Sequence, residues 1–478
     1  MTNTKRALIL SVFALVLCVS MLVGSTYAWF TDTATTGVST IQAGTLKVDL
    51  VDANDATLVG QSLTFQKAAG AENEPILWEP GCKYELAPVY VKNNGSLALK
   101  YQIIVNGLDG DAELLNVIDF KVMMNNAEVD LDTFEGKLAA DAKSAAITLV
   151  GEMSKDAGNE YQGKTLSGLS ITVVATQDTV ESDSYGNQYD AGATYPTPVS
   201  NAAELAAVLA NGGTASLTGD ITVDEPIEVS KSATIDFNGS ELNTSVSMNR
   251  PLKITGDDVK LVINADGTTN TFGNDTYGVV EIVEGVQNAT VEINGGKFEG
   301  TTKQGAFVKI RNNVTGKIVL NDVTFIDNCS VTAGNTNAFV MNTNGSTSGD
   351  VEVEINGGYM ESAGGFYIGG TVKKATLNGV TIKTEGAAFE AYCADGTYIN
   401  DCNITVVPGT TIWTAPAAGV AVSNNGQAFV TNTTIDSAGY GLYVYPTQNA
   451  DQGVIVANGC TITSVLGNVA GNGTITIQ

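Results

Sequence analysis

The 478-residue sequence contains no histidine. This absence excludes His-based zinc sites, Ser-His-Asp and Cys-His catalysis, and imidazole general bases. Positive charge is also scarce, because 24 Lys and Arg stand against 51 Asp and Glu, a formal net charge of −27. Such a charge repels nucleic acid and anionic membranes, so neither is expected as a partner. An apolar content of 43% exceeds that of disordered chains and predicts folded domains.

Cysteine and helical periodicity are sparse too. Six cysteines are scattered along the chain without the spacing of metal ligands, which predicts buried free thiols rather than a disulfide framework. No metal site and no cofactor are predicted, although an acidic loop such as Asp109–Glu113 offers calcium a weak site. The 52 glycines, the many Asn and Thr, and the lack of long helical patterns together predict an all-β fold.

The N-terminus has the order of a secretion signal. Lys5 and Arg6 precede the apolar run Ala7–Val23, and the small-residue site Thr26–Ala28 follows. We predict a signal peptide over residues 1–28, cleaved between Ala28 and Trp29; a retained N-terminal anchor is the alternative. The mature chain is then expected to be secreted, at the cell surface or in an extracellular matrix, with no membrane association after cleavage.

Residues 29–180 predict a first domain, a β-sandwich. Short alternating runs such as Thr45–Val51 and Lys100–Val105 are typical of strands, and turn clusters such as Glu79-Pro80-Gly81 lie between them. The cluster Asn93–Ser96 is interpreted as a hairpin turn, because glycine readily adopts positive φ.

Four stretches of this region resemble the TasA/camelysin family. They are AWFTDTATTGVSTIQAGTL after the signal, WEPGCKY, VKNNGSLALKY and the ending VVATQDTVESDSYGNQYDA, so the resemblance covers about residues 1–191. It implies a jelly-roll-like protein of Gram-positive bacteria, exported through a dedicated signal peptidase, that forms matrix or biofilm fibres with itself or related proteins. Camelysin has been described as a protease, but the H-E-x-x-H motif and all histidines are absent here.

The resemblance also implies that the mature N-terminal segment is donated to a neighbouring subunit by β-strand addition. Candidate anchors of such a donor strand are Trp29, Phe30, Val38 and Ile41. The competing interpretation, that these side chains pack within their own domain, stays open on the sequence alone.

Residues 181–199 are polar and contain Gly and Pro, which predicts a linker. A short amphipathic helix is predicted over Ser200–Ala210, with Ser200 or Asn201 as its N-cap, Glu204 at capping-box distance and Gly212-Gly213 at its end. We expect this helix to cover the first coil of the domain that follows.

Residues 200–478 predict a right-handed parallel β-helix that resembles the pectate-lyase-like superfamily. An apolar strand, an asparagine and a second short strand recur with variable loops, as a solenoid requires. Asparagine tolerates the left-handed bend and can bond to its counterpart in the next coil. The recurring residues are interpreted as one structural ladder of Asn238, Asn264, Asn294, Asn321, Asn356, Asn378, Asn400, Asn432 and Asn458.

Many β-helices degrade polysaccharides, so a secreted lyase or glycoside hydrolase is the alternative function. Lys309 and Arg311 form the one compact basic pair, and Asp322, Asp327 and Asp401 are acidic candidates that sit singly at turns. No paired carboxylates can be derived from this spacing. We therefore assign no catalytic residue and predict a protein that is not an enzyme.

Tyrosines in the second strand run of several coils indicate a binding function. Alternation with apolar neighbours would turn Tyr367, Tyr392, Tyr443 and Tyr445 outward, where they could form a platform for sugar rings; ordinary exposed tyrosines are the competing interpretation. The sequence thus predicts a secreted surface or matrix protein that displays a β-helix for adhesion or glycan binding. It is expected to assemble through the domain of residues 29–180, called the N-terminal module below.

Overall fold

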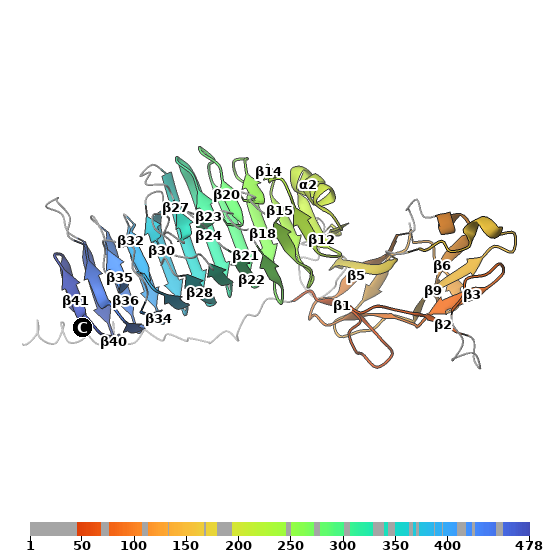
Figure 1. Cartoon of the computed structure of the whole chain (residues 1–478), viewed down its shortest axis with the longest axis horizontal. Helices are drawn as coiled ribbons and strands as arrows, with labels where there is room; N and C mark the ends of the chain where they lie inside the picture. Colours follow the sequence, from red (N-terminus) through yellow and green to blue (C-terminus); the bar gives the residue numbers. More distant parts are fainter. Residues whose placement is uncertain are drawn as a thin grey trace, which may run out of the picture. The chain divides into compact units, whose positions relative to one another are not determined.

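The computed structural model describes most of the chain after residue 44 (Figure 1). The described residues are 45–478 except 68–75, 108–112, 132, 167–168, 179–193, 245–249, 272–277, 301–305, 328–338, 343–348, 363–366, 370–371, 387, 394, 409–416, 423–425 and 446–452. Antiparallel sheets form the first part and a long parallel solenoid the second, which confirms the predicted all-β fold class.

The first part contains a five-stranded sheet, a three-stranded sheet and a two-stranded sheet, in the orders β2-β3-β9-β6-β7, β10-β5-β8 and β1-β4. The strands are β1 (Val48–Val51), β2 (Phe65–Gln66), β3 (Lys83–Leu86), β4 (Tyr90–Asn93), β5 (Leu99–Asn106), β6 (Ile118–Met124), β7 (Ala127–Glu128), β8 (Gly136–Leu138), β9 (Ile147–Met153) and β10 (Ser170–Gln177). Two short 3-10 helices are η1 (Glu113–Asn116) and η2 (Asn159–Tyr161).

The core of this part lies between the sheets. In β5 every second side chain, from Leu99 to Val105, is buried, because alternate residues of a strand face one side of a sheet. These side chains meet Ile147 and Leu149 from β9 and Val122 from β6 in one apolar cluster. The packing of antiparallel sheets face to face over one core is that of a β-sandwich.

The expected hairpin at Asn93–Ser96, directly after β4, is wrong. Strand β4 pairs with β1, whereas β5 pairs with β10 and β8, so this segment carries the chain from one sheet to another. The fully buried Asn93 holds it, since its side chain accepts a hydrogen bond from Gly95 N and donates to Leu97 O and Ala139 O. The Asn-Gly pattern therefore marks a sheet-crossing turn with a satisfied buried amide.

The second part, here called the solenoid, coils through three faces (Figure 1). The first face is a 12-stranded parallel sheet of β11 (Thr197–Val199), β12 (Gly213–Leu217), β15 (Ala233–Asp236), β18 (Lys260–Asn264), β21 (Ala289–Asn294), β24 (Val314–Asn321), β27 (Gly349–Asn356), β30 (Val372–Asn378), β33 (Thr397–Asn400), β36 (Gln427–Thr431), β39 (Val454–Asn458) and β42 (Thr474–Ile477). Residues 197–199, expected in the linker, are thus its first strand.

The second face holds β13 (Ile221–Val223) and β16 (Leu242–Thr244), followed by the eight-stranded sheet of β19 (Thr269–Thr271), β22 (Lys297–Gly300), β25 (Thr324–Asp327), β28 (Tyr359–Ser362), β31 (Thr381–Thr384), β34 (Asn403–Val406), β37 (Thr434–Ser437) and β40 (Thr461–Ser464). The third face holds two five-stranded sheets, first β14 (Ile227–Val229), β17 (Leu252–Ile254), β20 (Val280–Ile282), β23 (Ala306–Ile310) and β26 (Phe339–Asn342), then β29 (Tyr367–Gly369), β32 (Phe389–Tyr392), β35 (Ala418–Val422), β38 (Tyr440–Val444) and β41 (Gly467–Gly471).

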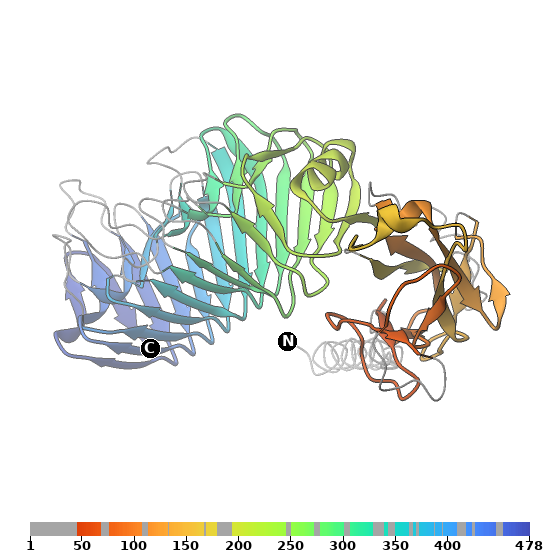
Figure 2. The same ribbon diagram turned by 45° about the vertical axis from the view of Figure 1, so that its right-hand side comes forward.

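Stacked apolar side chains fill the inside of the solenoid. On the first face, in-register neighbours from Ile235 through Ile293 and Ile355 to Val430 are all buried. Phe307 lies between Phe298 and Phe325, with ring centroids 5.2 and 4.9 Å apart. Figure 2 shows the coils following one another from green to blue. Each coil buries its apolar face only against its neighbours, as in other repeat proteins.

Helix α2 (Ala202–Asn211) covers the start of the solenoid. Asn201 is its N-cap and accepts a hydrogen bond from Glu204 N at 3.0 Å, while Glu204 accepts one from Ser200 N at 2.7 Å. This reciprocal pattern satisfies backbone donors at the helix start. Leu205 and Leu209 are fully buried in the solenoid core, and α2 packs on β12 and β14. The helix thereby shields the first coil.

The described cysteines Cys82, Cys393, Cys402 and Cys460 are free thiols. Cys393 and Cys402 are buried in the solenoid, and burial raises the pKa of Cys393 to about 11. A thiol with so high a pKa stays protonated and is a poor nucleophile near neutral pH. We assign these two cysteines to packing.

Candidate functional site

The N-terminal candidates lie outside the described residues. This holds for the cleavage site Ala28–Trp29 and for the anchors Trp29, Phe30, Val38 and Ile41. The chain becomes described just before β1, which pairs antiparallel with β4 from Val48–Asn93 to Val51–Tyr90. A bridge from Val51 to Thr57 and a hydrogen bond from Leu58 N to Leu50 O fold the following turn back onto the other edge of β1.

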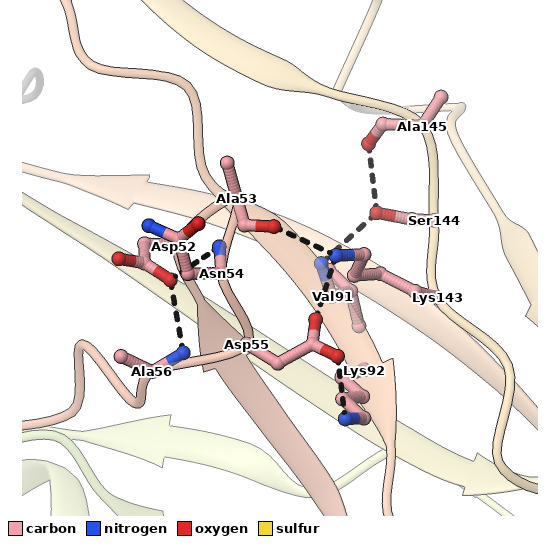
Figure 3. A network of polar contacts seen from close by, with 10 residues as sticks. All are labelled: Asp52, Ala53, Asn54, Asp55, Ala56, Val91, Lys92, Lys143, Ser144 and Ala145. Atoms are coloured by element: carbon pink, nitrogen blue, oxygen red, sulfur yellow. Dashed lines mark hydrogen bonds and ion pairs between the residues drawn. The ribbon is translucent and has the colours of Figure 1, made fainter.

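Asp55 anchors this turn to the sandwich (Figure 3). Its carboxylate pairs with Lys143 at 2.6 Å and with Lys92 at 3.0 Å, and Lys143 also donates to Ala53 O. Hydrogen bonds from Lys143 and then Lys92 lower the pKa of Asp55. Asp52 closes the turn by accepting from the backbone N–H of Asn54 and Ala56. The arrangement ties β1 to two distant segments of the chain and can hold its edge in place.

A tyrosine cluster lies at the far end of the third face, on β38. Tyr443 stacks on Tyr440 with centroids 5.2 Å apart and an interplanar angle of 27°, and it meets Tyr445 edge-on at 5.0 Å. All three are half-buried, so part of each ring reaches solvent. Strict alternation along the strand does not predict Tyr440, which is the first residue of β38. This cluster is the described part of the predicted sugar platform.

The other two candidate tyrosines do not adjoin this cluster. Tyr367 pairs with Glu390 and Tyr392 with Gly369, and nothing is described of their side chains. Tyr443 has Ala421 and Ala470 as its neighbours in the adjacent coils. Through Glu390 and Ala421, Tyr367 shares the register position of Tyr443 three coils away. The platform of four tyrosines stays a prediction.

An amide ladder runs along the end of the first face. The side chains of Asn294, Asn321, Asn356, Asn378 and Asn400 each donate to the ladder residue of the preceding coil at 2.8–3.0 Å. Asn264 donates to Asp236 at 2.6 Å, and Asn400 is in register with Thr431, which is in register with Asn458. Asp236 and Thr431 occupy the register positions expected for Asn238 and Asn432. Asn238 nevertheless donates to Ser216, which is in register with Asp236 in the preceding coil.

The reason is that two tasks assigned to asparagine are divided between adjacent residues. The ladder residue keeps an ordinary strand conformation, and from Asn294 onward the residue directly after it takes the left-handed one. After Asp236 the left-handed residue is Asn238, two positions later. Asn432 is such a corner residue, with φ of 50°, and Asp322 and Asp401 have φ of 53° and 55°. Elsewhere the corner is glycine, as at Gly295 and Gly357. Only Gly, Asn and Asp adopt this conformation readily, which gives these two acidic candidates a conformational role.

The basic pair Lys309 and Arg311 meets two residues that sequence analysis missed. Arg311 Nε and Arg250 Nη1 both donate to the carboxylate of Glu281, the latter at 2.8 Å. Lys309 is in register with Glu281 on the adjacent strand. The signal that could have revealed this cluster is the rarity of arginine, because the whole sequence contains only Arg6, Arg250 and Arg311.

Within the described ranges, no group of three or more His, Cys, Asp or Glu could hold a metal ion. Burial raises the pKa of Glu281, but the hydrogen bonds from Arg311 and Arg250 and the charges of these two residues together outweigh this effect and lower the pKa. A carboxyl group held ionised in this way is a poor general acid at neutral pH. Among the described residues, no helix has the length and apolar character needed to span a membrane.

One protein family matches part of this chain. Residues 3–60 match the model of the family described as camelysin metallo-endopeptidase. The match ends before Trp78–Tyr84 and Val91–Tyr101, so the similarity noted for those stretches lies outside it. Neither the curated proteins nor the solved structures that were searched gave a significant match.

Proposed function

We propose that this protein is a secreted component of a bacterial matrix or cell surface, in which the N-terminal module assembles subunits and the solenoid is displayed for adhesion or glycan binding. The match over residues 3–60 carries the proposal, because it spans the predicted signal peptide, the predicted mature N-terminus and β1. The resemblance of this stretch to TasA/camelysin fibre proteins supports an extracellular, structural role.

Assembly is proposed to run through residues 29–44. This segment carries apolar side chains among Thr and Ser, has a single charge and lacks proline, so its backbone can pair along its length. It leads directly into β1, whose following turn is tied down by Asp55, Lys92 and Lys143. A strand that is anchored at one end suits donation of the preceding segment to the next subunit.

Peptidase activity, which the printed description of the matched family names, is not part of the proposal. Zinc peptidases of the H-E-x-x-H type need two histidines as ligands, and this sequence has none. A polysaccharide-degrading activity remains the alternative, and its strongest support is the buried Lys309 beside Arg311 and Glu281.

The proposal is tested by comparing two purified chains, one beginning at Trp29 and one at Thr45, by electron microscopy and light scattering. We expect oligomers or fibres from the first, and a folded monomer from the second, because only the first contains the donor segment. Circular dichroism of both chains provides the folding control. Equal assembly by the two chains would refute the donated strand.

A further inference from the structure

Arginine is concentrated at one point of the solenoid. Of the three arginines in the sequence, Arg6 lies in the predicted signal peptide, and the other two bind the same carboxylate, that of Glu281. The other positive side chains of the chain are lysines. Arginine differs from lysine because its planar fork of donors matches a carboxylate with two parallel hydrogen bonds. Its restriction to this cluster calls for a function that lysine performs less well.

Three consecutive coils build the cluster on the third face. Arg250 precedes β17, Glu281 lies in the middle of β20, and Arg311 directly follows β23. Lys253 and Lys309 flank Glu281 in register on β17 and β23. The inward residues of these strands, such as Val280 and Ile282, belong to the core, so alternation places Glu281 and Lys309 on the outer side of the sheet.

Burial orders four of these charged groups, Glu281, Arg250, Arg311 and Lys309, by depth. The side chain of Glu281 is 5% exposed and that of Arg250 12%, whereas that of Arg311 is 33% exposed. Lys309 is buried, and this burial, together with the charges of Arg311 and Arg250, lowers its pKa to about 8. Arg311 is the member that reaches solvent. Because its Nε is bound to Glu281, the guanidinium is oriented before any ligand arrives.

We propose that Arg311 is the contact residue of a binding site for the carboxylate groups of an acidic glycan, with Glu281 and Arg250 as the residues that position it. This inference rests on the proposed display of the solenoid for glycan binding and names the class of glycan. A carboxylate-bearing sugar suits the site better than a phosphate polymer, because the net charge of −27 repels a polyanion of high charge density.

The tyrosine cluster lies on the same face of the solenoid. Strands β23 and β38 belong to the two sheets of the third face, and β26 and β29 pack against each other where these sheets meet. Five coil steps separate β23 from β38, which corresponds to roughly 24 Å at the usual strand spacing. One extended glycan chain could thus contact Arg311 through a carboxylate and Tyr443 through a sugar ring.

The experiment measures binding of the mature chain to polygalacturonate, to a neutral glucan and to inorganic polyphosphate by calorimetry. We expect Arg311→Gln to weaken polygalacturonate binding about tenfold or more and to leave the affinity for the neutral glucan unchanged. The melting temperature of this variant should fall only slightly. Arg311→Lys keeps the charge but not the fork, and an intermediate loss is expected. Lys317→Gln is the matched control, because Lys317 is also paired with a carboxylate, that of Glu354 at 2.8 Å, but on the first face.

Three results would overturn the inference: equal binding of polygalacturonate by the parent and Arg311→Gln, an equal loss in Lys317→Gln, or a preference for polyphosphate over polygalacturonate. If Arg311→Gln fails to fold, Arg311→Lys decides, and unchanged affinity then refutes the site. The two proposals fail separately. Neutral glucan binding without an Arg311-dependent acidic component contradicts only this inference, whereas no binding of any glycan contradicts glycan display itself.

Discussion

At the scale of single residues, the solenoid places chemically similar side chains in different roles. Asp322 and Asp401 take left-handed corners, and Glu281 is buried between two guanidiniums. Among the lysines, Lys317 is half-exposed and hydrogen-bonded to Glu354, which raises its pKa, whereas burial lowers that of Lys309. Residue type therefore does not determine the role; burial and the nearest charge do.

The lowered pKa of Lys309 predicts a specific pH dependence of stability. The folded pKa is about 8 and the unfolded value about 10.4, so between these values the unfolded chain binds more protons and stability rises with pH. Lys309→Met removes this gain. The difference in the free energy of unfolding between the parent and Lys309→Met should therefore shift in favour of the parent by about 1–3 kcal/mol from pH 8 to pH 10.

Thermal unfolding at several pH values measures this difference. Lys317→Met is the control, because the pKa shift of Lys317 has the opposite sign. A lysine with a raised folded pKa contributes stability that is lost as the pH rises through that pKa. Parallel pH profiles for the parent and Lys309→Met would contradict the assignment.

At the scale of elements, the solenoid is held by contacts between neighbouring coils. The ladder asparagines from Asn264 to Asn400 each bond to the coil before them, and the apolar residue one position earlier stacks in the core. Helix α2 closes the first coil with Leu205 and Leu209. Stability of such a structure is approximately a sum of terms within coils and between neighbouring coils.

Asn321→Ala tests the ladder. The side chain of Asn321 donates to Asn294 and accepts from Asn356, so both hydrogen bonds are lost and a half-buried amide is left without its partner. We expect a loss of about 1–3 kcal/mol in urea unfolding. The control is Asn403→Ala, an exposed asparagine on β34 outside the ladder, which should change stability by less than about 0.5 kcal/mol. Equal costs for both variants would show that the ladder has no special contribution.

At the scale of the whole molecule, charge limits what the protein can bind. The net charge of −27 disfavours polyanions in general, so an acidic glycan needs a local cationic contact, and a neutral glycan needs apolar surface. On the third face, Arg311 supplies a cationic contact, and the tyrosine cluster of Tyr440, Tyr443 and Tyr445 supplies apolar surface. The N-terminal module would multiply these sites by assembly, since linked sites bind a polymer far more tightly than single ones.

The tyrosine contribution is predicted separately. Tyr443→Ala combined with Tyr445→Ala should weaken binding of a neutral glucan by ~1 kcal/mol per ring without unfolding the coil. The control is Tyr398→Ala, whose ring is stacked on Phe429 at 5.1 Å on the first face. Calorimetry and thermal melting of the same samples measure both quantities. A loss of affinity in Tyr398→Ala as large as in the double variant would argue against the tyrosine cluster as the binding surface.

Local patterns account for what could be predicted from the sequence. Alternating apolar residues, the repeated asparagine and the capping box around Asn201 and Glu204 each depend on neighbours within a few positions, so they indicated the all-β class, the coil architecture and α2. The complete lack of histidine excluded whole classes of catalysis without any structure.

Register and burial between coils were decided only by the tertiary structure. Loops of variable length separate the strands, so the pattern could not show that Asp236 and Thr431 occupy the ladder positions expected for Asn238 and Asn432, or that Tyr443 is in register with Ala421 and Ala470 in the adjacent coils. Nor could it show that Arg250 and Arg311, 61 positions apart in the sequence, meet on Glu281. Coiling brings such residues within hydrogen-bonding distance because each coil returns the chain to the same face, and the loops determine which residues then meet.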